Sequence, residues 1–439
     1  MLIRDATLAD GRRRDVRIDG DRIAAVAAAN STDPDADAAA TPVVDAAGRL
    51  LLPGAIDVHV HFRQPGHGHK ETWATGSRSA AAGGVTTVVD QPNTTPPTTT
   101  GRAYDEKESL TRDSLVDYGI NGGVTETWDP DTLLSRPLFA LGEVFLADST
   151  GDMGIDADLF ADAVSRAADF GVPVTVHAED ATLFDADIEG SDAGGVGRDA
   201  DADRWSALRT AEAEAAAVER AVDVAGTSGA QLHIAHTSTP EGVDIASDAG
   251  ATCEVTPHHL FLSRDDLHEL GTYGRMNPPL RSEQRRQAVF ERVADGTVDM
   301  IATDHAPHTI EEKEQGLWDA PSGVPGVETM LPLLLAAARE GHWSYERVRD
   351  LVCRRPAEVF DLPRKGRIAE GYDADLVLVD PDSPREITGE TLHSKCGWTP
   401  FEGRQGVFPD LTLVRGHVAY ERVDGEARFG ETIGENVRA

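Results

Sequence analysis

The feature that most constrains the fold is a repeated pattern: short apolar runs alternate with helix-compatible segments, and several of the runs end in a polar side chain. The run at residues 50–56, for example, leads directly into Asp57-Val58-His59-Val60-His61. Alternating strands and helices favour a parallel sheet, and a (β/α)8 barrel gathers the C-terminal ends of its strands at one face. We therefore expect an α/β fold, a (β/α)8 TIM-type barrel, with one site at those strand ends.

His59 and His61 are two residues apart, which places both imidazoles on the same face of a β-strand. Two imidazoles on a rigid strand are a natural half of a divalent-metal site, and nitrogen-rich ligand sets favour zinc. A pair of polar residues on a half-exposed strand is the alternative interpretation, because two histidines match this spacing by chance fairly often.

Later apolar runs end in further side chains of the same kinds. They deliver Asp90-Gln91-Pro92-Asn93, Glu143, His177-Ala178-Glu179, His236-Thr237-Ser238 and Thr303-Asp304-His305. A barrel would bring these residues together although they are spread over much of the chain. Since chance placement at so many strand ends is improbable, the set predicts a site for two metal ions.

Short apolar runs joined by Asp/Gly turns dominate both ends of the chain. Residues 16–18 and 23–26 flank the turn Asp19-Gly20-Asp21-Arg22, which predicts a hairpin, and residues 374–380 and 411–416 repeat this style near the C-terminus. We expect residues 1–53 and 364–439 to form one small composite β-domain and residues 54–363 to form the barrel. A chain of 439 residues has room for both.

The net charge of −35 is the strongest signal in the composition. Binding to nucleic acid or to anionic membranes depends on Lys and Arg clusters, so this charge argues against both kinds of partner. Self-repulsion at low salt destabilises a compact state, whereas molar salt shrinks the screening length to about 3 Å. We therefore expect a halophilic host, with an acidic mesophilic protein as the alternative.

Cysteine usage and hydropathy point to the cytoplasm. Cys253, Cys353 and Cys396 lie far apart without Cys-x-x-Cys spacing, which suits reduced thiols. No apolar stretch approaches the roughly 18 residues of a membrane span, and the first residues lack the apolar core of a signal peptide. We expect a cytoplasmic protein.

Several motifs together carry a resemblance to a known family. They are the stretch 53–66, Lys70-Glu71-Thr72, Gln91-Pro92-Asn93-Thr94, His236-Thr237-Ser238-Thr239, and the stretches 254–260, 276–281, 302–308 and 323–329. On these motifs the chain resembles the amidohydrolase superfamily and, more closely, the dihydroorotases. The His-x-His strand and the segment 303–308 are shared with allantoinases and hydantoinases, whereas the combination of Arg63, Asn93, Asn277 and His308 favours the dihydroorotases.

The resemblance implies two zinc ions per subunit. The positions that match the family's ligands are His59, His61, His177, His236 and Asp304. In hydantoinases and many dihydroorotases a carboxylated lysine on the fourth strand bridges the metals, but the matching position here is Glu143, and no lysine occurs between Lys107 and Lys313. Glu143 carries the same carboxylate charge and can form the bridge. Asp148 is an alternative bridge, and Glu143 as an ordinary buried strand residue is the third interpretation.

The reaction that the resemblance implies is the reversible cyclisation of N-carbamoyl-L-aspartate to (S)-dihydroorotate and water, a step of de novo pyrimidine (UMP) biosynthesis. Asp304 would be the catalytic residue, which accepts a proton and passes it on. Arg63 would bind the carboxylate that does not react, with further hydrogen bonds from Asn93 and His308.

The resemblance places the remaining substrate contacts on two loops. Asn277 would face the ring, and the backbone at Ser322 and Gly323 would pair with the ring's amide edge, because glycine lets a backbone approach a ligand closely. The polar, Glu-rich segment 309–321 lies beside this site in the sequence and could act as a lid.

Two other functions compete with this one. An allantoinase or another hydantoinase-like hydrolase would use the same metal chemistry on a different cyclic amide. A catalytically inactive homologue would serve as a scaffold for a partner enzyme, although inactive copies usually lose metal ligands and each expected position is filled here. A homo-oligomer is compatible with the sequence.

Overall fold

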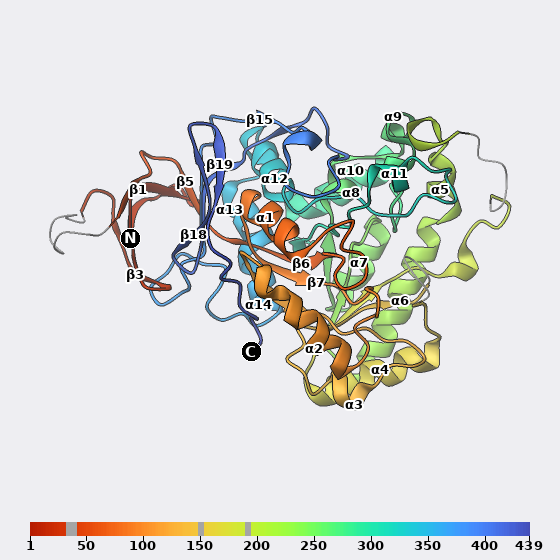
Figure 1. Cartoon of the computed structure of the whole chain (residues 1–439). Coiled ribbons are helices and arrows are strands. Elements are labelled where there is room, and N and C mark those ends of the chain that lie inside the picture. Colours follow the sequence, from red (N-terminus) through yellow and green to blue (C-terminus); the bar gives the residue numbers. More distant parts are fainter. Residues whose placement is uncertain (32–41, 148–152, 189–194) are drawn as a thin grey trace.

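Parallel strands between residues 55 and 301 form the centre of the structure. The computed structural model describes residues 1–31, 42–147, 153–188 and 195–439 (Figure 1). A three-stranded sheet consists of β6 (Ala55–Val60), β7 (Val85–Asp90) and β8 (Asp117–Ile120). A five-stranded sheet consists of β9 (Leu141–Phe145), β10 (Val174–His177), β11 (Leu232–Ile234), β12 (Thr252–Val255) and β13 (Met300–Ile301). Neighbouring strands within both sheets are parallel.

Single parallel bridges join these two sheets at both edges. Gly122 pairs with Leu141 between β8 and β9, and Val60 pairs with His305 between β6 and the segment after β13. The strands therefore follow one another in chain order, as in a (β/α)8 barrel, and their C-terminal ends point to the same side.

Helices between the strands cover the outside of the barrel (Figure 1). Their bounds are α1 (Trp73–Ala82), α2 (Gly101–Leu110), α3 (Pro130–Leu133), α4 (Ala157–Phe170), α5 (Asp203–Leu208), α6 (Ala211–Ser228), α7 (Pro240–Asp248), α8 (Pro257–Phe261), α9 (Leu267–Leu270), α10 (Glu283–Asp295), α11 (Ile310–Lys313), α12 (Met330–Arg339), α13 (Tyr345–Arg349) and α14 (Arg355–Val359). None of the helices described here combines the length and the apolarity that crossing a membrane requires.

Helix α4 illustrates why these segments pack against the strands. Its buried residues Phe160, Ala163, Val164 and Ala167 recur at intervals of one helical turn, so they form one apolar face. The side chain of Asp156 accepts a hydrogen bond from the backbone N–H of Leu159 and caps the start of the helix.

Both ends of the chain contribute to one nine-stranded sheet beside the barrel. Its strands are β1 (Leu2–Leu8), β2 (Arg13–Asp19), β3 (Arg22–Ala28), β4 (Val43–Asp45), β5 (Leu50–Pro53), β14 (Leu376–Val379), β17 (Pro409–Val414), β18 (His417–Val423) and β19 (Glu426–Phe429). The order is β19-β18-β17-β14-β5-β1-β2-β3, with β4 beside β1, so β5 and β14 join the two ends of the chain. Figure 1 shows the red N-terminal strands beside the blue C-terminal ones.

The strands of this sheet lie within the expected ranges 1–53 and 364–439. We propose that these two ranges form one domain and that residues 54–363 form the other. The antiparallel pair β2 and β3 forms the expected hairpin. Between β14 and β17, a small two-stranded sheet of β15 (Arg385–Glu386) and β16 (Gln405–Gly406) leads into residues that pack with the barrel's loops: Ile387, Trp398 and Phe401 share a core cluster with Met276 and Val324.

Candidate active site

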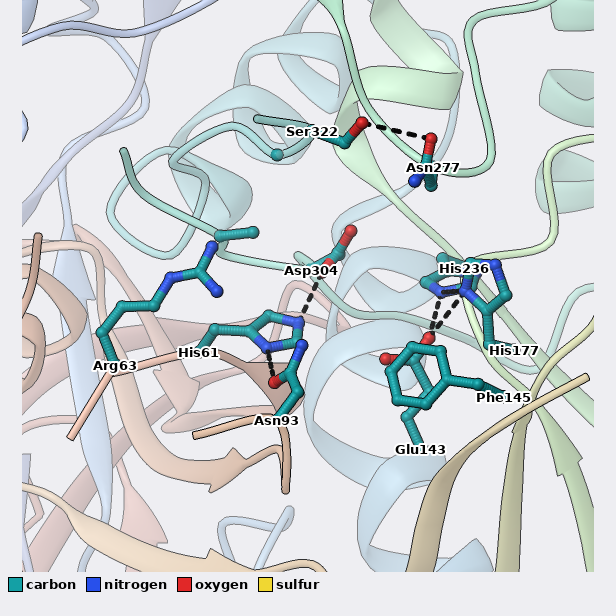
Figure 2. A pocket seen from close by; sticks show the side chains of 12 residues that line it. His61, Arg63, Asn93, Glu143, Phe145, His177, His236, Asn277, Asp304 and Ser322 are labelled. Carbon is teal, nitrogen blue, oxygen red and sulfur yellow. Dashed lines mark hydrogen bonds and ion pairs between the residues drawn. The ribbon is translucent and has the colours of Figure 1, made fainter. Parts of the chain in front are cut away.

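A pocket lies at the C-terminal ends of the barrel strands (Figure 2). It is lined by His61, Arg63, Asn93, Glu143, Phe145, His177, His236, Asn277, Asp304, Ala306, Ser322 and Gly323. Of the site residues expected from the sequence, only His59 and His308 are absent from this lining, and both are buried directly behind it. The fold thus brings strand ends from across the sequence into one site.

His59, on β6, and His61, directly after that strand, point into the carboxylate-rich side of the site. His59 Nδ1 donates to Glu254 Oε1 at 2.7 Å, so Nε2 is directed towards Glu143 Oε2 at 3.4 Å and Asp304 Oδ1 at 3.6 Å. His61 Nδ1 donates to Asn93 Oδ1 at 2.7 Å, and its Nε2 lies 2.9 Å from Asp304 Oδ1.

Glu143 lies between the imidazoles of three other strands. Its Oε1 is 3.0 Å from His177 Nδ1 and 2.5 Å from His236 Nε2 (Figure 2), while His59 approaches its second oxygen. On the far side of His177, Nε2 donates to Glu179 Oε2 at 2.9 Å. Glu143 therefore contacts imidazoles from β6, β10 and the end of β11.

These residues suit a metal ion by both geometry and chemistry. His59, His61 and Asp304 form one group with ligand atoms within 4.8 Å of one another, and His59, Glu143 and His236 form a second. The buried atoms His59 Nε2 and His236 Nδ1 have no hydrogen-bond partner among the residues that the structure describes, which is costly unless another group binds them. Imidazole and carboxylate together are a typical ligand set for zinc.

Both carboxylates of this cluster are held in the ionised form. Burial opposes ionisation of Glu143, but the imidazoles of His236 and His59 keep its pKa well below the usual range. Burial likewise opposes ionisation of Asp304, and the hydrogen bond with His61 together with nearby imidazoles lowers its pKa to about 2. The site accordingly carries two anionic groups at neutral pH.

Three residues of the site have left-handed backbone conformations. The φ angles are 65° at Arg63, 35° at His236 and 47° at Asp304, a region that residues other than glycine seldom adopt. All three residues follow the end of a barrel strand and line the pocket. Such strained positions tend to cluster at functional sites, where the surrounding structure enforces them.

Arg63 forms the cationic part of the pocket wall. Its Nε donates to the carbonyl oxygen of Pro307 at 3.2 Å, and its Nη2 lies 3.1 Å from His308 Nε2. His308 is fully buried behind Arg63, and its Nδ1 accepts from Lys70 Nζ at 3.1 Å. Burial and the nearby Arg63 charge hold the pKa of His308 well below its usual range, so the ring is neutral.

Asn277 and Ser322 lie on the wall opposite Glu143 (Figure 2), and Gly323, the residue after Ser322, also lines the pocket. Ser322 Oγ donates to Asn277 Oδ1 at 3.3 Å, and the indole nitrogen of Trp205 donates to the same oxygen at 3.0 Å. Gly323 has a φ of 130°, and a Cβ there would lie 2.6 Å from the carbonyl oxygen of Ala306. Glycine is therefore required at this position.

Sequence reasoning assigned no role to two buried glutamates that orient the histidines. Glu254, on β12, accepts from His59 through one oxygen and from His233 Nε2 through the other at 3.1 Å. Glu179 accepts from His177 and is paired with the Arg209 guanidinium. The available signals were the position of Glu254 in a strand and the spacing of two residues between His177 and Glu179. Asp148, the alternative bridge, lies outside the described residues.

Comparisons with known proteins agree with this geometry. A dihydroorotase of Halobacterium salinarum is 64% identical over 442 residues, which cover 100% of this chain and 99% of that protein. A dihydroorotase of Methanosarcina mazei is 45% identical over 403 residues, covering 88% and 87% of the two chains.

Solved structures share the fold. The L-hydantoinase (dihydropyrimidinase) from Arthrobacter aurescens matches with a TM-score of 0.91 at 28% identity, over 99% of this chain and 98% of that one. The dihydropyrimidinase from Brevibacillus agri matches with a TM-score of 0.87 at 27% identity, over 100% and 98%. These matches confirm the expected α/β barrel architecture. The sequence also matches the model of the amidohydrolase family over residues 50–418, and the chain therefore belongs to the amidohydrolase family.

Proposed function

We propose that this chain is a dihydroorotase, which catalyses the reversible cyclisation of N-carbamoyl-L-aspartate to (S)-dihydroorotate and water in pyrimidine biosynthesis. The observation that carries the proposal is the Arg63 guanidinium in the wall of a pocket that also contains a cluster of imidazoles and carboxylates. Such a site can bind a substrate anion at one end and act on an amide at the other. The names of the archaeal relatives support the same activity.

We further propose that two zinc ions occupy the site. His59, His61 and Asp304 would hold one ion, His177 and His236 would hold the other, and Glu143 would bridge them. The cluster supports this arrangement because Glu143 contacts imidazoles from both groups. When bound, such ions supply Lewis acidity, which polarises the carbonyl group under attack.

Asp304 is the proposed proton carrier. In cyclisation the carbamoyl nitrogen attacks the carbon of the side-chain carboxylate and gives up a proton to Asp304, which delivers it to one carboxylate oxygen. That oxygen takes a second proton from solvent and leaves as water. In hydrolysis Asp304 takes a proton from the attacking water and passes it to the ring nitrogen as the C–N bond breaks. The ionised state of Asp304 is compatible with this role, because a carboxylate can accept a proton.

Arg63 is proposed to bind the carboxylate that does not react. Its planar guanidinium suits a bidentate carboxylate contact, and His308 acts on the substrate through Arg63 because it is buried behind that side chain. Asn93, whose Oδ1 accepts from His61, would donate from its amide nitrogen to the substrate. Asn277, Ser322 and Gly323 would contact the ring's amide edge.

The remaining expectations rest on composition and on the activity proposed above. With a net charge of −35, we propose that the protein binds neither nucleic acid nor anionic membranes and works in a salt-rich cell. The scattered cysteines support a cytoplasmic location, and the proposed activity implies small-molecule substrates. A homo-oligomer is compatible with this proposal.

Turnover of three substrates, measured together with metal content, tests the proposed function. We expect about two zinc ions per chain and turnover of dihydroorotate at least 100-fold above that of allantoin and hydantoin. Faster turnover of allantoin or hydantoin would assign the chain to another cyclic-amide hydrolase. Full metal content without turnover of any of the three would favour the inactive scaffold.

A further inference from the structure

Lys313 is a buried cation beside the pocket that the proposed chemistry does not use. It ends helix α11, and its side chain is fully buried. Its Nζ donates to three backbone carbonyl oxygens, those of Arg275 at 3.2 Å, Pro321 at 2.9 Å and Gly323 at 3.0 Å. An ammonium group is the side-chain group that offers three N–H donors from one atom, and all three are used here.

The other buried lysines of the described chain have carboxylate partners. Lys107 pairs with Asp90 at 2.6 Å, and Lys365 pairs with Asp117 and Asp375. Lys313 forms no ion pair with any residue that the structure describes. Carrying a buried charge without a counter-ion is costly, so carbonyl dipoles must replace both water and counter-ion at this point.

The three carbonyl groups belong to the two segments that form the pocket wall opposite Glu143. Pro321 and Gly323 flank Ser322, and Arg275 lies two residues before Asn277. The backbone N–H of Gly323 also donates to the carbonyl oxygen of Arg275 at 3.0 Å. Lys313 thus fastens both segments at one point, directly behind Asn277, Ser322 and Gly323.

Further contacts join this point to the part of the pocket around Arg63. Lys313 Nζ lies 5.6 Å from the centre of the Trp398 ring, and the indole nitrogen of Trp398 donates to the carbonyl oxygen of His308 at 2.8 Å. Burial, followed by the charges of Arg275 and Arg63, lowers the pKa of Lys313 well below its usual range. The three carbonyl acceptors oppose this shift, because hydrogen bonds to the charged form favour it.

We propose that Lys313 is a positioning residue for the substrate: it holds the segments 275–277 and 321–323 in register so that Asn277, Ser322 and Gly323 face the ring together. This inference rests on the proposed function, because the ring-binding role of this wall does. It assigns Lys313 no contact with the reacting atoms and none with the metal cluster. The expected consequence of its loss is weaker substrate binding with an intact metal site.

The test compares the parent, Lys313→Met and Lys313→Arg in steady-state kinetics with N-carbamoyl-aspartate, together with zinc content. Lys313→Met removes all three donors, and we expect KM to rise about tenfold or more while kcat changes less than threefold and zinc content stays parental. Lys313→Arg keeps the charge and several donors and should recover part of the loss in KM. Lys365→Met is the matched control, because it removes a buried lysine outside the pocket and should lower the melting temperature without changing KM.

Several results would overturn the proposal. A parental KM in Lys313→Met, or a joint loss of kcat and zinc, would show that Lys313 does not act on substrate binding. If Lys313→Met does not fold, Lys313→Arg decides by the same KM criterion. Failure of both variants to fold would show that Lys313 is needed for folding and would overturn the proposed positioning role. Turnover by the parent is measured separately, so a failure of the proposed function is distinguishable from a failure of this inference.

Discussion

The two walls of the pocket are built in different ways. The strand wall lies at the ends of barrel strands and consists of His59, His61, Glu143, His177 and His236. Its histidines contact further carboxylates, such as Glu254 and Glu179. The loop wall, consisting of Asn277, Ser322 and Gly323, lies on connecting segments and is held from behind by N–H donors, those of Lys313 and Trp205.

The two walls differ because one carries imidazole side chains and the other carries buried backbone carbonyl groups. Imidazoles that bind a metal need an acceptor on their other nitrogen to fix the ring and its tautomer, and a carboxylate provides one. Loop backbones have carbonyl groups that must be satisfied once buried, and a cation satisfies several at once. Damage to the strand wall should therefore affect metal binding and turnover, whereas damage to the loop wall should affect substrate binding.

The largest expected effect concerns Asp304, which borders both walls. Asp304→Asn should lower turnover by about 10²-fold or more, because an amide cannot accept the proton and is a poorer metal ligand. Circular dichroism and the melting temperature check that the fold survives. Turnover within a few-fold of the parent would remove Asp304 from its assigned role.

A second prediction concerns the carboxylate behind the strand wall. Glu254→Gln should weaken zinc affinity by about 10- to 100-fold, since the neutral amide orients His59 less strongly. Titration with a competing chelator measures the affinity. Glu328→Gln is the matched control, because Glu328 is also buried and accepts from a histidine, His393 at 2.8 Å, outside the pocket. Equal effects in the two variants would show that Glu254 has no specific role at the metal site.

A smaller effect is expected at the loop wall. Asn277→Ala should raise KM for N-carbamoyl-aspartate by about three- to tenfold, the loss expected for a single hydrogen bond, with zinc content unchanged. Steady-state kinetics and metal analysis provide both values. Asn436→Ala serves as control, because this amide bonds to Tyr104 away from the pocket. Loss of zinc in Asn277→Ala would contradict the separation of the two walls.

A change in salt concentration should have the smallest effect on the zinc content and substrate contacts of the two walls. Both walls are buried, so raising KCl from dilute to molar should leave zinc content unchanged, while the unfolding midpoint rises as screening relieves self-repulsion of the charge of −35. Thermal unfolding at several KCl concentrations measures the midpoint. A midpoint that is flat or falls with salt would contradict the expected salt adaptation.

The two walls also differ in how far the sequence reveals them. The strand wall can be predicted from the local sequence pattern. Strand periodicity and the ends of the apolar runs predict that His59, His61, Glu143, His177 and His236 are neighbours. The loop wall has no such periodicity, and Asn277, Ser322 and Gly323 were expected only from the resemblance to a family.

The supporting residues were missed for a physical reason. Glu254 and Glu179 were visible at or near strand ends, but only the three-dimensional structure shows which histidine each one contacts. Lys313 lies in a polar segment that composition suggests is exposed, and nothing local indicates that its side chain turns inward to three carbonyl groups. The shared sheet of the two termini was expected from matching patterns of runs and turns, whereas its strand order was not.

The zinc content of Glu143→Ala tests the central claim most directly, namely that Glu143 supplies the shared anion of the strand wall. The parent, reconstituted with zinc in bicarbonate-free buffer, should recover full activity, because a glutamate needs no carbon dioxide to form the site. Glu143→Ala should lose at least one zinc ion per chain, since two close positive charges would remain without the carboxylate between them, while the control Glu328→Ala keeps the parental content. Two zinc ions retained in Glu143→Ala, with near-parental turnover, would contradict the account and assign the bridge to another group such as Asp148.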